Sequence, residues 1–230
     1  MESIAENRQQ AGLSKTKIYI GIAMAFLFPL VTSLLINTLP VSSWTKIYAS
    51  RLVFWSEILL LWLYARKVEK QNLLIWDEKS SDLNFMVTSI MALYALNIGA
   101  QIISAIPTLL GYHENRAIMK QIAAIVRGRP LFILFISVTA GFCEEIIFRG
   151  YLLTRLSLLF KNKAVPVILS SILFSAMHYR YNMPREYLFT FLIGVIFSIH
   201  YQRFGNIKPL IITHVLIDVI NLTLASHYLK

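Results

Sequence analysis

Long runs of hydrophobic residues alternate with short polar segments along most of the chain. A bilayer core of ~30 Å is crossed by about 20 helical residues, and most of the runs are close to that length. They predict an all-α fold, a polytopic transmembrane helical bundle of about seven spans (six to eight). The predicted spans cover residues 18–39, 47–65, 83–110, 131–160, 164–179, 186–204 and 207–229.

Prolines and glycines mark where several of these helices begin, end or break. Pro40 ends the first span. Pro166 and Pro209 fall in the first turns of the fifth and seventh spans, where proline is tolerated because its missing N–H has no helical partner there. The third span is long enough to tilt, or to break near Gly99 or Pro107.

The segments between the runs are polar. Residues 1–17 form a polar N-terminal tail, and the apolar run that follows has 22 residues. A signal-peptide core has only about 7–15 residues, so we interpret this run as a retained first span and residues 18–230 as a single membrane domain. The longest connection, residues 111–130, mixes apolar and basic residues, which predicts an amphipathic helix on the membrane surface.

Composition supports membrane insertion and argues against nucleic acid as a partner. Hydrophobic residues make up 57% of the 230 residues and charged residues 15%, whereas soluble domains average about 45–50% and 25%. The net charge is +10, but the Lys and Arg residues are scattered among short loops without a basic stripe. We therefore expect membrane lipid, not nucleic acid, to attract them.

Two adjacent carboxylates, Glu144 and Glu145, stand inside the fourth apolar run, and Arg149 follows them. A charge at bilayer depth costs at least ~3 kcal/mol, so such residues indicate function or an internal ion pair. Glu145 and Arg149 lie one helical turn apart and can pair. Glu144 points about 100° away, which allows it to face a cavity. The alternative is one structural ion-pair cluster of all three side chains.

Histidines occur in three of the later spans. His178 follows Phe174 by four residues near the end of the fifth span, and His214 precedes Asp218 by four residues in the seventh. Residues spaced by four share a helix face, and two polar groups on an apolar face need a polar partner. His200 ends the sixth span beside a polar loop, and we interpret it as a packing residue.

Glu144, His178 and His214 are residue types that can hydrolyse a peptide bond if they meet around one water molecule. A buried glutamate with a neutral histidine can deprotonate water, and a second histidine can donate to the developing oxyanion. The same three side chains could instead bind a divalent metal such as zinc, although the H-E-x-x-H motif is absent. The single cysteine, Cys143, excludes an intramolecular disulfide and is expected to be a small buried residue, with a thiol nucleophile as the alternative.

The depths of Glu144, His178 and His214 in the membrane argue against their reaching one water molecule from straight helices. Counted at 1.5 Å per residue from the connection between the fourth and fifth spans, the three side chains fall at different depths. Straight helices normal to the membrane would keep them apart. The sequence therefore predicts strongly tilted helices, or helices that begin at different depths.

These motifs, in this order on successive apolar helices, resemble the CAAX protease and bacteriocin-processing family (CPBP, or Abi) of intramembrane proteases. The resemblance covers residues 131–229. It implies that Glu144 activates water with His178, that Glu145, Arg149 and Phe174 support the site, and that His214 stabilises the oxyanion. It also implies a metal-free glutamate mechanism in an enzyme historically called a metalloprotease, so no cofactor is favoured.

One position departs from the family pattern, because many members have Asn where Asp218 stands. An ionised Asp cannot donate to an oxyanion. Asp218 is therefore expected to be protonated, or only to orient His214.

The expected protein is a multi-pass enzyme of the bacterial cytoplasmic membrane that cleaves a membrane-associated peptide or protein. Two other functions stay open at this stage. One is a non-proteolytic bacteriocin-immunity or scaffold protein of the same fold. The other is a small transporter that uses Glu144 and the histidines as a proton relay, which the lack of paired broken-helix repeats disfavours.

Overall fold

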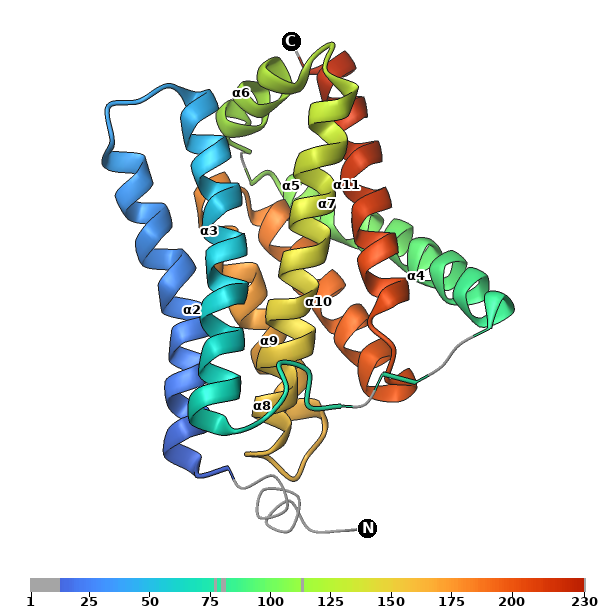
Figure 1. The fold of residues 1–230 in the computed structure, drawn as a ribbon. Coiled ribbons are helices and arrows are strands. Elements are labelled where there is room, and N and C mark those ends of the chain that lie inside the picture. Colours follow the sequence, from blue (N-terminus) through green and yellow to red (C-terminus); the bar gives the residue numbers. More distant parts are fainter. Residues whose placement is uncertain (1–12, 77, 80–81, 113, 230) are drawn as a thin grey trace. The chain divides into compact units, whose positions relative to one another are not determined.

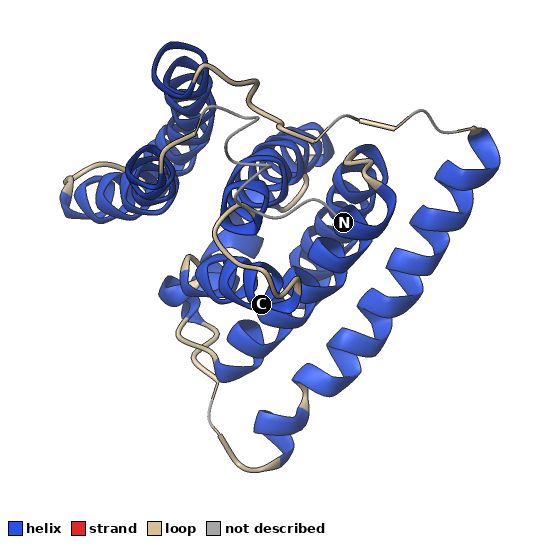
Figure 2. Cartoon of the chain, turned by 90° about the horizontal axis from the view of Figure 1, so that it is seen from below, coloured by secondary structure: helices blue, strands red, loops and turns tan. Residues whose placement is uncertain are grey.

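A computed structural model describes residues 13–229 except 77, 80–81 and 113. In this described part all regular secondary structure is helical, and Figure 2 draws no strand. In chain order the elements are α2 (Lys15–Thr38), α3 (Ser43–Tyr64), the π-helix η1 (Ala65–Glu69), α4 (Leu83–Ser104), α5 (Ile106–Leu109), α6 (Ala117–Val126), α7 (Pro130–Glu145), the π-helix η2 (Ile146–Leu153), α8 (Thr154–Ser157), α9 (Ala164–Ala176), the 3₁₀ helix η3 (Tyr179–Tyr181), α10 (Pro184–Phe204) and α11 (Lys208–Tyr228).

Helices occupy all seven predicted spans, which confirms the all-helical membrane fold. Among the described residues, five helical stretches are long and apolar enough to cross a bilayer, two fewer than the seven or so predicted. α9 has only 13 residues, and α10 has 21 residues but is less apolar than the five. The five stretches are Lys15–Thr38, Ser43–Glu69, Leu83–Leu109, Pro130–Ser157 and Lys208–Tyr228.

Local sequence signals account for most helix ends. α2 ends at Thr38, two residues before Pro40, and Pro209 lies in the first turn of α11. The predicted break in the third span falls between α4 and α5, just before Pro107 and not at Gly99. The surface helix predicted between residues 111 and 130 is present as α6.

Side-chain caps fix where three of the helices begin. Ser14 accepts a hydrogen bond from the Lys17 N–H, and Ser42 caps α3 in the same way. The Asp82 carboxylate accepts from the Phe85 N–H at 2.7 Å at the start of α4. Each cap satisfies a backbone donor that the first helical turn leaves without a partner. α2 therefore begins inside the polar tail predicted over residues 1–17, of which residues 1–12 lie outside the described part.

The helices form two compact units. Unit 1 contains residues up to 77 together with 143–170, and unit 2 contains residues 78–142 together with 171–230. The single membrane domain expected over residues 18–230 stays a prediction.

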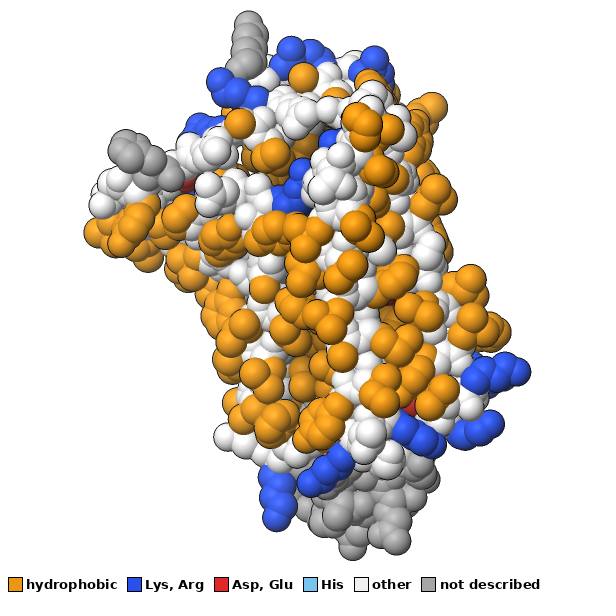
Figure 3. Space-filling view, turned by 90° about the vertical axis from the view of Figure 1, so that its left-hand side faces the viewer, with side chains coloured by type: hydrophobic (Ala, Val, Ile, Leu, Met, Phe, Trp, Pro, Cys, Tyr) orange, Lys and Arg blue, Asp and Glu red, His pale blue; other side chains and the backbone are white. Residues whose placement is uncertain are grey.

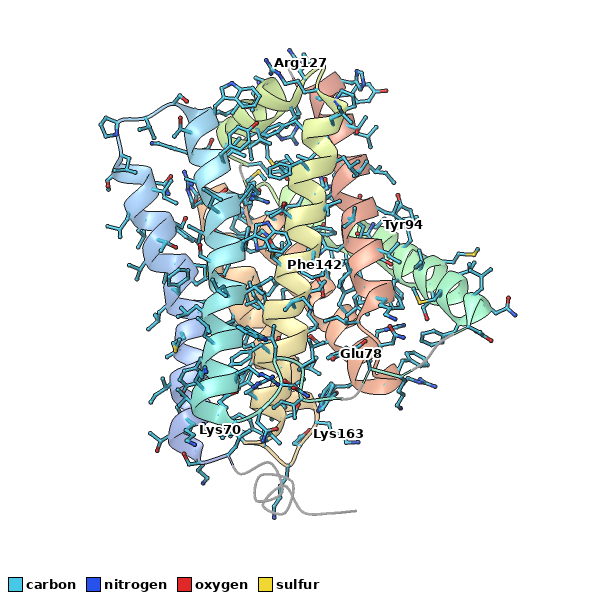
Figure 4. The ribbon with its side chains drawn as sticks, in the orientation of Figure 1. Lys70, Glu78, Tyr94, Arg127, Phe142 and Lys163 are labelled. Atoms are coloured by element: carbon cyan, nitrogen blue, oxygen red, sulfur yellow. The ribbon has the colours of Figure 1, made fainter. Side chains whose placement is uncertain are left out.

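Unit 1 is built on the hairpin of α2 and α3, which lie side by side in Figure 1. The Tyr64 hydroxyl donates to the Lys17 carbonyl at 2.9 Å and joins the end of α3 to the start of α2. Both helices also pack against η2. Lys70 and Lys163 lie at the same end of this unit in Figure 4.

A fully buried ion pair between Arg155 and Glu69 lies in unit 1. Arg155 Nη2 lies 2.7 Å from Glu69 Oε2, and Arg155 Nη2 also donates to the Asn72 carbonyl at 2.9 Å. The Tyr151 hydroxyl donates to Glu69 Oε1 at 2.9 Å. The network therefore ties the end of η1 and the chain after it to η2 and α8.

Unit 2 is held together by the packing of α4 on α10 and α11, and of α6 on α11. Glu78, labelled in Figure 4, hydrogen-bonds to residues on both sides of the turn between α10 and α11. Its Oε2 accepts from the Ile207 N–H at 2.8 Å, and its Oε1 accepts from the Tyr201 hydroxyl at 2.9 Å. A carboxylate at the start of α11 also interacts favourably with the helix dipole.

Arg127, labelled in Figure 4, secures the other end of α11. Its guanidinium donates to the carbonyls of Ser226 and Leu229 at 2.8 and 2.7 Å. These carbonyls belong to the end of α11, where backbone acceptors lack helical donors and a cation is favoured.

The outer faces of α2 and α3 are hydrophobic. Leu35 is 60% exposed and Leu52 is 68% exposed. Figure 3 shows hydrophobic side chains over the middle of the face on which α2 lies, with Lys and Arg gathered below. An apolar band flanked by basic side chains is typical of a surface that contacts lipid.

Candidate active site

The glutamate motif lies where an α-helix changes into a π-helix. α7 is α-helical up to Glu145, and the chain continues without a break into η2. All eight residues of η2 are buried. Short π-helical segments inside α-helices occur often at functional sites because they turn side chains out of the regular α register. No feature of the sequence predicted this change.

The predicted pairing of Glu145 with Arg149 is present. Arg149 Nη1 lies 2.9 Å from Glu145 Oε1, and the two side chains are 1% and 0% exposed. A buried charge is tolerated when it is paired, and this pair gives both residues a structural role.

Glu144 stands beside the pair but is only half-buried. It interacts electrostatically with Glu57 of α3 and with its neighbour Cys143. Cys143 is fully buried, as expected for a small packing residue. The sequence places Glu57 in a span but gives no sign that it approaches Glu144.

His178 lies just beyond the end of α9, because that helix stops at Ala176. The predicted helix to residue 179 is therefore wrong by three residues, because the chain leaves α-helical geometry after Ala176 and continues into the 3₁₀ helix η3, which ends at Asn182 in the left-handed region. His178 Nδ1 lies 3.0 Å from the Phe174 carbonyl. Because a carbonyl only accepts, Nδ1 carries the proton in a neutral ring, and the Nε2 lone pair remains available as a base or acceptor.

Both predicted histidines, His178 and His214, pack against the aromatic ring of Phe174. Its ring is 3% exposed. Its centroid lies 5.0 Å from that of His178 and 6.4 Å from that of His214, both edge-to-face. The Tyr181 ring also stacks on His178, with centroids 5.9 Å apart. The supporting role expected for Phe174 thus has a geometric basis, because one packed ring restricts both imidazoles.

His214 and Asp218 share a face of α11, as their spacing predicts. His214 Nε2 lies 3.9 Å from Asp218 Oδ2, which is longer than a hydrogen bond. The His214 ring also packs edge-to-face on Phe197, with centroids 6.3 Å apart.

α7 approaches α11 very closely at Gly141. A Cβ atom on Gly141 would lie 2.7 Å from Val215 Cγ2 and 3.4 Å from His214 Cβ. Only glycine allows this approach. Phe142, the next residue of α7, is labelled in Figure 4, and Glu144 follows Gly141 by three residues in the same helix.

Two further polar side chains lie in unit 2. Glu186, in the first turn of α10, interacts electrostatically with His178, and no sequence motif marked it. His200 is 9% exposed and packs on Phe204 and Phe85, with ring centroids 4.7 and 6.3 Å away. These contacts agree with its interpretation as a packing residue.

The predicted site residues are divided between the two units. Glu144, Glu145 and Arg149 belong to unit 1, whereas Phe174, His178, His214 and Asp218 belong to unit 2. The contacts given above for each group lie within one unit. Among the described residues, no group of three or more His, Cys, Asp or Glu side chains is arranged to hold a metal ion.

A comparison with known families agrees with the motifs. Residues 127–220 match the model of a family described as type II CAAX prenyl endopeptidase Rce1-like. This segment includes every predicted site residue from Glu144 to Asp218, and the match confirms the family resemblance there. No curated protein and no solved structure matches the chain. Residues 127–220 are therefore similar to CAAX prenyl endopeptidases, and five helical stretches of the described residues are long and apolar enough to cross a membrane.

Proposed function

We propose that the protein is an intramembrane endopeptidase that hydrolyses a peptide bond in a membrane-associated peptide or protein. The observation that carries the proposal is the contact of one buried ring, Phe174, with both His178 and His214. Two histidines fixed by one packed side chain keep a set separation. A water-activating group and an oxyanion donor need such a fixed separation.

Glu144 is the general base in this mechanism. Its neighbour Glu145 is paired with Arg149 and fully buried, whereas Glu144 is only half-buried and takes the proton from water. His178 accepts a hydrogen bond from the same water through Nε2, because Nδ1 is engaged with the Phe174 carbonyl. The mechanism requires both side chains to reach one water molecule. Positioned proton transfer of this kind contributes about 10²–10⁴-fold to a rate.

His214 stabilises the charge that forms when water attacks. The water oxygen bonds to the carbonyl carbon, its proton passes to Glu144, and the carbonyl electron pair moves onto oxygen. An N–H of the neutral His214 ring donates to this oxyanion. When the carbonyl reforms, the C–N bond breaks and the amine leaves with the proton from Glu144. The protein is then unchanged, and one water has been consumed.

Asp218 orients His214 in this scheme and does not bind the oxyanion. Its carboxylate lies on the Nε2 side of the ring but beyond hydrogen-bond distance. No metal takes part in any step, and metal-free chemistry stays a prediction.

The name of the matched family suggests the substrate class to test first, which is a prenylated CAAX peptide. The purified protein in liposomes is incubated with a farnesylated CAAX peptide, and released peptide is measured by mass spectrometry. We expect Glu144→Gln and His178→Ala to abolish cleavage while both variants insert and accumulate normally. Cys143→Ala is the matched control and keeps full activity. Cleavage by Glu144→Gln at the wild-type rate would reject the proposal.

A further inference from the structure

Glu57 is a buried carboxylic acid in the middle of α3, and its side chain is 0% exposed. Neither Oε1 nor Oε2 has a hydrogen-bond partner within the described part of the chain. A buried polar group without a partner costs about 1–3 kcal/mol, and a charged one costs more. Such a group in a membrane span is unusual unless it has a function.

The other two fully buried glutamates of unit 1 are each neutralised by a buried arginine. Glu69 is paired with Arg155 at 2.7 Å, and Glu145 is paired with Arg149 at 2.9 Å. Both are explained by structure alone. Glu57 has no ion pair of this kind within 4.0 Å in the described part of unit 1, so packing does not explain why an acid stands there.

Glu57 interacts electrostatically with Glu144, the residue proposed as the general base. Cys143, which is fully buried next to Glu144, interacts electrostatically with both glutamates and with Arg51 of α3. The geometry agrees with this interaction, because α3 packs against η2, which directly follows the glutamate motif. All of these residues belong to unit 1.

Two carboxylates that interact in an environment of low dielectric do not both stay ionised. Glu57 is the one that lacks an ionic or hydrogen-bonding partner among the described residues, and Glu144 is the one less buried. A proton on Glu57 would remove a buried charge that has no hydrogen-bond partner among the described residues. A neutral carboxylic acid has one O–H donor, and the acceptor of highest charge near it is the Glu144 carboxylate.

We propose that Glu57 is a positioning residue, a neutral acid whose O–H group supports the ionised Glu144 through one shared water molecule. The proposal rests on Glu144 being the base of the proposed endopeptidase. Glu57 keeps its own proton throughout the cycle, and the proton taken from the attacking water goes to Glu144. A hydrogen bond of this kind holds the carboxylate in one orientation and keeps it available as a base.

Two substitutions separate this role from a structural one. Glu57→Leu removes the donor together with the buried polar group, so its melting temperature should equal or exceed that of the wild type. Its kcat on the farnesylated CAAX peptide should fall about 10- to 100-fold, as expected for a lost hydrogen bond to a charged group, with KM unchanged. Glu57→Gln keeps an N–H donor of the same reach and should restore most of kcat.

Asn97→Leu is the matched control. Asn97 lies in α4, is 1% exposed, and its Oδ1 also has no hydrogen-bond partner in the described part of the chain. The same exchange of a buried polar group for leucine should leave both kcat and KM unchanged. Wild-type kcat in Glu57→Leu would overturn the proposal, and so would a Glu57→Gln variant as inactive as Glu57→Leu.

Infrared spectroscopy tests the protonation of Glu57 without any substrate. At neutral pH the wild type should show the C=O stretch of a protonated carboxyl group that is absent from Glu57→Gln. Glu144→Gln should keep this band and shift its frequency. If Glu57→Gln removes no such band, the proposal is wrong whether or not a peptide is cleaved. If the band behaves as expected but Glu144→Gln still cleaves peptide, the proposed function fails while Glu57 stays a neutral acid beside Glu144.

Discussion

The guanidinium of Arg149 lies 2.9 Å from the Glu145 carboxylate, and neither side chain reaches solvent. Removing one member of such a pair leaves the other charged and buried, which costs about 3–5 kcal/mol. We therefore expect Arg149→Met to lower the melting temperature of the detergent-solubilised protein strongly. The double variant Glu145→Gln with Arg149→Met should recover most of that loss. A single variant with wild-type stability would show that the pair carries no structural role.

Gly21 of α2 lies against Tyr151 of η2. A Cβ atom there would overlap the Tyr151 hydroxyl, which is fully buried and bonded to Glu69. Gly21→Ala should therefore destabilise the protein by about 1–3 kcal/mol, as expected for overpacking. Gly99→Ala is the control, because a Cβ atom at that position would meet no other group within 4 Å. Alanine is the better helix former, so Gly99→Ala should stabilise by up to about 1 kcal/mol.

Arg155 anchors the chain after η1 to α8 through Glu69 and the Asn72 carbonyl. Arg155→Met leaves Glu69 buried without its cation, and we expect a large loss of thermal stability. Arg66→Met serves as the control, because Arg66 is exposed and its hydrogen bond to Asn72 is long, at 3.4 Å. Exposed substitutions of this kind change stability within about 0.5 kcal/mol. Equal melting temperatures for the two variants would contradict the anchoring role.

Asp218 should tolerate replacement by asparagine. Its carboxylate lies 3.9 Å from His214 Nε2, and the Asn amide has a similar shape with an added N–H donor. Asp218→Asn is therefore expected to keep or raise kcat on the cleaved peptide, whereas His214→Ala should reduce kcat at least about 10²-fold. Comparable losses in the two variants would show that the Asp218 carboxylate itself is required.

The helices, their order and the Glu145–Arg149 pair could be predicted because each depends on residues close together in sequence. Apolar run length places the spans, and spacing by four places the pair. The number of long apolar helices in the described part is five and not seven, because α9 is too short and α10 is less apolar than the others. The prolines at 40, 107, 166 and 209 gave correct boundaries for the same local reason.

The remaining features depend on packing between distant segments. The change to a π-helix after Glu145 has no signature in the residue pattern. The approach of Glu57 to Glu144 follows from the packing of α3 on η2, although an acid within a span already indicates function. The contact of Phe174 with His214 also joins residues far apart in the chain. The four-residue spacing of Phe174 and His178 gave no indication of it.

Comparative proteomics of membranes that contain either the wild type or Glu144→Gln tests the central claim most directly. The two proteins must be present in equal amounts, which immunoblotting checks. The account predicts that at least one membrane-associated peptide or protein stays uncleaved with Glu144→Gln and is shortened at a single peptide bond with the wild type. Identical peptide profiles for the two proteins would contradict the assignment of Glu144 as the base of a peptidase.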